Sequence, residues 1–191
     1  MTGRRPKGNR QSGFTLLEVL ITAVIIAFGL LSLAALQAKM VTTQMEAYQR
    51  AHALVLLEDM VARINTQRQA ARGGAYATTG ADTGLGSGDG YDASAGCAGM
   101  SEPARDLCEW SAALKGAATQ QGGQFLGAMI GARGCIERTG SDPAAFRVSV
   151  AWQGLTETVA PAAALTCGAG AYGDETLRRV LAAQVTLADL N

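Results

Sequence analysis

The chain of 191 residues carries 16 basic and 16 acidic side chains, one histidine and four cysteines. This balance of charge does not favour a general nucleic-acid-binding surface. The single histidine, His52, leaves no Ser-His-Asp or Cys-His arrangement for catalysis, so we expect no enzyme activity and no cofactor. Once a basic leader and a long apolar segment are set aside, the length suits one modest domain.

The N-terminus joins a basic leader, residues 1–13, to an apolar run. The leader contains four basic residues and no acid, and from Phe14 to Leu36 the only formal charge is Glu18. As a helix the run is roughly 35 Å long, enough to cross a hydrocarbon core of about 30 Å. By the positive-inside rule the leader stays in the cytoplasm, and residues after Leu36 lie outside it. A carboxylate inside such a segment suggests a function.

The sequence Gly13-Phe14-Thr15-Leu16-Leu17-Glu18 resembles the processing site of type IV prepilins. An ordinary secretory signal fits poorly because no apolar core precedes the cut. The alternative is a plain signal anchor in which Glu18 is accidental. The resemblance implies that a prepilin peptidase cleaves between Gly13 and Phe14 and methylates the new Phe14 amine. It also implies that Glu18 pairs with the Phe14 amine of a neighbouring subunit during assembly.

The first helix is expected to continue past the membrane segment, from about Thr15 to Arg68. Apolar residues recur in steps of three, four and seven, which is typical of one helical face. These residues are Met40, Ala47, Ala51, Leu54, Leu57, Val61 and Ile64. The predicted organisation is a removed leader (1–13), a transmembrane and assembly half of the helix (14–36), an amphipathic half (37–72) and a globular head outside the cytoplasm (73–191).

The segment from Gly73 to Gly99 contains nine glycines. We expect it to form a surface loop that buries little apolar surface. Its aspartates, Asp82, Asp89 and Asp92, have no spacing typical of a calcium loop, and we interpret them as solvated turn residues.

The rest of the head is predicted to be mixed. A helix from Glu102 to about Ala118 has Ser101 as a candidate cap. Alternating residues predict a half-buried strand over Phe146–Trp152 and another over Leu181–Leu187, with weaker candidates at 134–138 and 155–159. The expected fold class is α+β, with a small antiparallel sheet against the long helix.

All four cysteines follow the apolar run, which places them in an oxidising compartment and predicts two disulfides. Three pairings are possible. We favour Cys97–Cys108 and Cys135–Cys167, because each closes a loop around a segment that otherwise lacks apolar residues. A zinc site is the competing interpretation, but the sequence contains no CxxC pair and His52 is far away.

Three further segments resemble the PilV family of type IV minor pilins. They are Phe28–Gln37 at the end of the membrane run, Arg105–Trp110 followed by Leu114, and the strand Phe146–Trp152. The family resemblance implies a type IV pilin-like fold and a place in a small complex of minor pilins at the fibre tip. That complex would prime assembly of the major pilin and help carry a tip adhesin outward.

The apolar run contains no proline, which disfavours a bulk fibre subunit. Two alternatives share the N-terminal motif: a pseudopilin of a type II secretion system, and a minor pilin for DNA uptake. On the resemblance, the chain first spans the inner membrane once and later enters the surface fibre, with adhesion and twitching motility as the associated functions.

Overall fold

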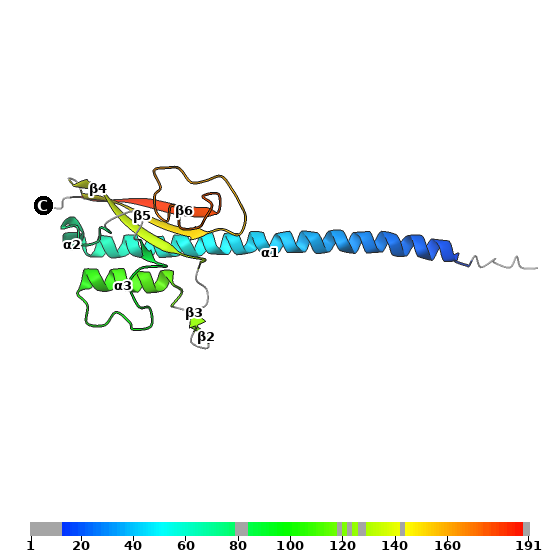
Figure 1. Ribbon diagram of the computed structural model, residues 1–191, viewed down its shortest axis with the longest axis horizontal. Coiled ribbons are helices and arrows are strands. Elements are labelled where there is room, and N and C mark those ends of the chain that lie inside the picture. The colour runs from blue at the N-terminus through cyan, green and yellow to red at the C-terminus, as the bar shows by residue number, and fades with distance from the viewer. Residues whose placement is uncertain are drawn as a thin grey trace, which may run out of the picture. The chain divides into compact units, whose positions relative to one another are not determined.

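The computed structural model describes residues 13–78, 84–117, 120–121, 124–125, 129–141 and 144–188. Contacts between residues divide the chain into two units, Met1–Gln44 and Met45–Asn191, which we describe separately. The elements in chain order are α1 (Leu16–Thr66), α2 (Arg68–Arg72), β1 (Leu85–Gly86), α3 (Glu102–Leu114), β2 (Gln120–Gln121), β3 (Gln124–Phe125), β4 (Arg133–Ser141), β5 (Ala144–Gln153) and β6 (Arg178–Leu187) (Figure 1).

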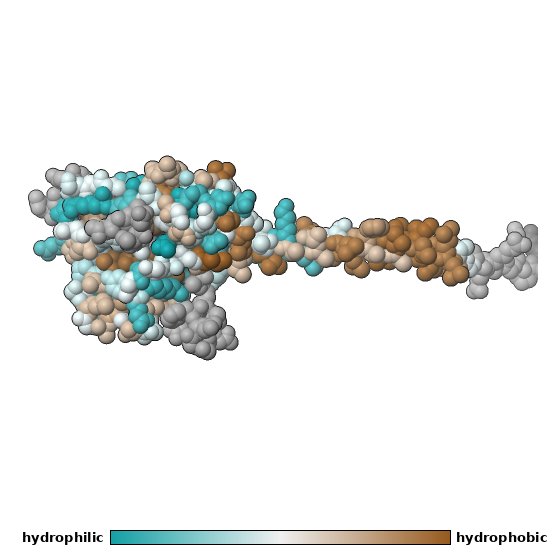
Figure 2. Space-filling model, in the orientation of Figure 1, coloured by the Kyte–Doolittle hydropathy of each residue, from teal (hydrophilic) through white to brown (hydrophobic). Residues whose placement is uncertain are grey.

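The first unit consists of the N-terminal part of α1. In the described part of the chain, α1 is the one helix long and apolar enough to cross a membrane by length and composition, with a mean hydropathy of 2.7 in its most apolar window. Figure 2 shows this apolar surface as a continuous brown stretch. The hydroxyls of Thr22 and Ser32 donate to the carbonyls of Val19 and Phe28, at 2.9 and 3.0 Å. These bonds satisfy the two hydroxyl groups within the helix itself.

The second unit, the head, contains the remainder of α1 and all of the sheet. The side chains of α1 that are buried in the head are Gln49, Ala53, Leu56, Leu57, Met60 and Ile64. The predicted apolar face was therefore wrong in part, because Ala47, Ala51 and Leu54 are exposed. This part of α1 is apolar on more than one side, so spacing alone does not identify the side that packs. The helix ends at Thr66, two residues before the predicted Arg68.

The four-stranded sheet is antiparallel throughout, in the order β1-β4-β5-β6. The two strongly alternating segments lie within β5 and β6, and the weaker candidate at 134–138 lies within β4. The candidate at 155–159 was wrong, since these residues form no strand. A long N-terminal helix combined with a small antiparallel sheet is the α+β, pilin-like architecture that the sequence predicts.

Strand β5 is buried on both faces, whereas alternation predicted a half-buried strand. Phe146, Val148 and Val150 are fully buried in the core that also contains the α1 side chains. On the opposite face Ala151 packs in a second cluster with Tyr172 and the sulfur atoms of Cys135 and Cys167. The segment between β5 and β6 therefore covers the face that the sequence pattern leaves to solvent.

Helix α3 packs through Trp110, whose indole N–H donates to the carbonyl of Leu56 on α1 at 2.8 Å. The ring lies against Gly134 of β4 so closely that a Cβ there would sit 2.3 Å from a ring carbon. The helix ends at Leu114, earlier than the predicted Ala118. Ser101 occupies the N-cap position, but its side chain makes no capping hydrogen bond, so that expectation was wrong.

The glycine-rich segment is not only a surface loop. Tyr76 is fully buried, and Leu85, in β1, is 6% exposed. Asp89, expected to be solvated, accepts hydrogen bonds from the backbone N–H groups of Gly86 and Tyr91, at 2.8 and 3.1 Å, and pairs with Lys115. Asp92 is exposed and bonds only within its own turn, to Ser94. Asp82 lies outside the described residues.

Candidate functional site

The predicted cleavage site lies just before α1, in backbone that is not helical. Gly13 and Phe14 are both exposed, and the Phe14 side chain is 83% accessible. A Cβ built on Gly13 would meet no atom within 4 Å. The peptide bond between Gly13 and Phe14 therefore lies in an exposed, non-helical segment just before α1.

Thr15 determines where the helix starts. Its hydroxyl oxygen accepts the backbone N–H of Glu18 at 3.3 Å, and its carbonyl accepts the N–H groups of Glu18 and Val19. These contacts satisfy donors that the first turn of a helix otherwise leaves unpaired. The sequence predicts a helix that begins at about Thr15, and the spacing Thr15-x-x-Glu18 is that of a capping box.

Glu18 lies in the first turn of α1, exposed. A carboxylate at this end of a helix interacts favourably with the helix dipole. Its side chain forms no ion pair with any residue that the structure describes, so the carboxylate remains available to a partner. Glu18 thus lies in the first turn of α1, five residues after Gly13 and four after Phe14.

The four cysteines form two disulfides, Cys97–Cys108 and Cys135–Cys167, separated by 11 and 32 residues. These are the pairs that the loop argument favours. The first joins the glycine-rich segment to α3, and the second joins β4 to the segment between β5 and β6. With all four sulfur atoms in disulfides, no thiolate remains to bind zinc.

Several buried and half-buried polar side chains join the elements of the head. Arg63 on α1 donates to Asp106 and Glu109 on α3, at 2.9 and 2.7 Å, and Tyr76 donates to the same Asp106. Burial raises the pKa of Tyr76, and the hydrogen bond to Asp106 raises it further. For Asp89, burial acts to raise the pKa, but Lys115 and the hydrogen bonds outweigh it and hold the pKa below its usual range.

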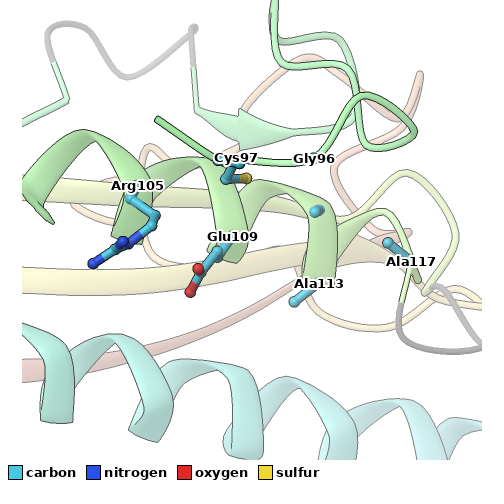
Figure 3. Close-up of a pocket in the computed structure, with 8 residues that line it drawn as sticks. Gly96, Cys97, Arg105, Glu109, Ala113 and Ala117 are labelled. Atoms are coloured by element: carbon cyan, nitrogen blue, oxygen red, sulfur yellow. The ribbon is translucent and has the colours of Figure 1, made fainter. Parts of the chain in front are cut away.

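An open pocket of about 480 Å³ lies between α3 and the segment around Cys97 (Figure 3). Its two charged side chains, Arg105 and Glu109, are paired with Glu102 and Arg63. Small side chains and backbone form the rest of its wall: Gly96, Cys97, Ala98, Ala112, Ala113 and Ala117. The pocket has the character of a groove between packed segments, without a nucleophile beside a base.

His52, the single histidine, is half-buried on α1. Its ring stacks on Tyr48, one turn earlier on α1, with the ring planes 9° apart and the centroids separated by 6.2 Å. The stacked position gives His52 a packing role.

Comparison with known proteins supports the N-terminal site. The sequence model of a family described as the prokaryotic N-terminal methylation motif matches residues 8–34. No curated protein matches the chain. No solved structure matches it either. The match supports a type IV pilin-like or pseudopilin protein that a peptidase processes, and it covers Gly13, Phe14, Glu18 and most of the apolar run.

Proposed function

We propose that this chain is a minor pilin of the type IV pilus, similar to the PilV family, that enters the fibre near its tip and helps to prime assembly. The observation that carries the proposal is Glu18, which is exposed in the first turn of an apolar helix and forms no ion pair with any described residue. It lies four residues after Phe14 of the non-helical Gly13–Phe14 segment, inside the matched motif. In the assembled tip its partners are other minor pilins, the major pilin and a tip adhesin.

Processing begins with prepilin peptidase. One water molecule is consumed as the Gly13–Phe14 bond breaks, so that Gly13 leaves with a carboxylate and Phe14 gains an amine. The peptidase then methylates that amine with a methyl group from a sulfonium donor. The chain is the substrate in both steps.

The proposed domain organisation follows the same division as the sequence. The leader, 1–13, is removed, residues 14–36 occupy the inner membrane, 37–72 continue the helix, and 73–191 form a head outside the cytoplasm. Two disulfides in the head support an oxidising compartment. On assembly the membrane helix exchanges lipid for partner helices and enters the surface fibre.

Glu18 would determine the axial position of the subunit. Within the fibre its carboxylate meets the Phe14 amine of a neighbour in a low-dielectric environment. A subunit placed at the wrong axial position would leave a buried charge unpaired. Breaking a buried ion pair in this way typically costs roughly 3–5 kcal/mol. The ion pair therefore favours one register over its alternatives.

Substitution of Glu18 by alanine tests this proposal. Glu18→Ala should leave membrane insertion intact, because the change makes the helix more apolar, and should lower the amount of the chain in sheared fibres at least about tenfold. Glu58→Ala is the matched control, since Glu58 is an exposed acid on the same helix. Wild-type amounts of Glu18→Ala in fibres would contradict the proposal.

Deletion of the gene separates the pilus from the two alternative systems. A minor pilin of the priming complex predicts loss of surface pili with normal export of secreted enzymes. Loss of enzyme export with normal pili would instead identify a type II secretion pseudopilin, and a defect confined to DNA uptake would identify the third candidate.

A further inference from the structure

Strand β6 forms one edge of the four-stranded sheet. It pairs with β5 alone, through ten consecutive residue pairs without a register shift. Between Val180 and Leu187 the strand contains no charged residue and no proline. Among the described residues, none forms a backbone hydrogen bond to the outer edge of this stretch.

The hydrogen bonds of β4 show which groups of β6 point outward. The backbone N–H of Ile136 donates to the Thr78 hydroxyl, and the Ile136 carbonyl accepts the Thr78 N–H. The backbone N–H and C=O groups of Ile136 therefore point away from β5. Along an antiparallel strand, the backbone groups of successive residues point alternately to the two neighbouring strands. The N–H and C=O groups of Val148, the residue opposite Ile136, therefore point toward β6 and bond to Ala183. The N–H and C=O groups that point away from the sheet are then those of Val180, Ala182, Gln184 and Thr186.

Within Val180–Leu187, the described stretch of this edge has none of the usual protection against strand addition. Natural sheets block their edges with charges, prolines, bulges or short strands. The two arginines that open β6 are already engaged, Arg178 with Glu175 and Arg179 with Glu46. Leu181 and Ala183 are only half-buried against the core, so one more strand would complete their burial.

We propose that the outer edge of β6, Val180–Leu187, pairs with an extended strand of a different subunit in the assembled fibre tip. The proposal rests on the proposed function and names the kind of contact by which the head joins its neighbours. An uncharged edge fits an uncharged strand, because a charged one would lose hydration without gaining a counter-charge. The partner segment alternates apolar side chains on the α1 face with small polar ones on the other face.

A second copy of this chain fits the edge poorly. Head-to-tail addition would require pairing with the opposite edge, where β1 has only two residues. Two-fold pairing of β6 with itself would reverse the second head, including the α1 segment that packs across the sheet. The α1 residues within the two heads would then run antiparallel, whereas subunits that enter one fibre from one membrane run parallel.

Amide hydrogen exchange tests the proposal on the intact mature chain, in detergent and in sheared fibres. The N–H groups of Ala182, Gln184 and Thr186 should exchange at least about tenfold more slowly in fibres, whereas Ala183 and Val185 should be protected in both samples. Equal exchange of the outward amides, with the chain present in fibres, would overturn this inference alone. Absence of the chain from fibres would overturn the proposed function and the inference with it.

Two further measurements identify the occupant. Gln184→Pro removes an outward N–H but no bond to β5, so the head should fold while incorporation into fibres falls at least about tenfold. The control Gln184→Ala should be incorporated normally, and normal incorporation of folded Gln184→Pro would overturn the proposal. If the outward N–H groups become more protected in detergent as the protein concentration rises, a second copy of the chain occupies the edge. That result would also overturn the proposal.

Discussion

At the scale of single residues, the tightest steric constraint in the head is the contact between Gly134 and Trp110. A side chain at position 134 has no free space, because a Cβ would lie 2.3 to 2.7 Å from atoms of Trp110 and Leu114. Both neighbours are fully or almost fully buried, so neither can move without disturbing the core.

Gly134→Ala should therefore destabilise the head. Overpacking of this kind typically lowers the free energy of unfolding by about 1–3 kcal/mol. The measurement is urea unfolding of the full chain in detergent, followed by the fluorescence of Trp110 and Trp152. Gly90→Ala is the control, because a Cβ at Gly90 meets no atom within 4 Å. Equal midpoints for the two variants would contradict the packing argument.

Asp89 shows why some residues of the head could not be predicted. The sequence places it among glycines, which is typical of a solvated turn. In the structure it bonds to Ser111 and Lys115, which lie 22 and 26 residues away in the sequence. Local pattern contains no information on such long-range partners, whereas the cleavage motif is contiguous and could be recognised directly.

At the scale of elements, Glu46 joins α1 to the segment that precedes β6. Its carboxylate accepts the backbone N–H groups of Leu155 and Thr156, at 2.9 and 3.1 Å, and pairs with Arg179. Burial acts to raise the pKa of Glu46, but the hydrogen bonds and Arg179 outweigh it, so the pKa lies below its ordinary value. The N–H groups of Leu155 and Thr156 bind this side chain, so they are not available for the hydrogen bonds of a strand.

The stability of the head should depend on the ionisation of Glu46. Because its folded-state pKa is lowered, the stabilisation is complete above the unfolded pKa and disappears as the pH falls through the folded value. Glu46→Gln should cost about 1 kcal/mol at neutral pH, and the difference from wild type should vanish in acid. The measurement is the unfolding midpoint of the wild type and of Glu46→Gln at a series of pH values from neutral to acid. Glu58→Gln is the control. A difference independent of pH would exclude an electrostatic role.

The periodicity of the sequence predicted where the helices and strands lie better than it predicted which of their faces are buried. The long helix and the strands β5 and β6 followed from spacing and alternation alone. The buried face of α1 and the second covered face of β5 did not, because both depend on which segments pack there. For β5 that segment is held by the Cys135–Cys167 bond, a constraint between residues 32 apart.

At the scale of the whole molecule, the N-terminus makes the most direct prediction about maturation. If peptidase processing occurs as proposed, the mature chain begins with N-methylated Phe14 and lacks residues 1–13. Mass spectrometry of the chain purified from membranes measures this in one step. An N-terminus at Met1, or a cut beyond Leu36, would show that α1 is a different kind of anchor.

The contact between Gly134 and Trp110 also has an evolutionary consequence. Related sequences should keep glycine at position 134 as long as a large aromatic side chain occupies position 110. Substitutions at the two positions should therefore occur together across lineages. Such covariation would arise inside the head without any contact to another subunit. Position 134 should therefore be among the most conserved positions of this protein. The reason would be selection for folding of the head and not for recognition of a partner.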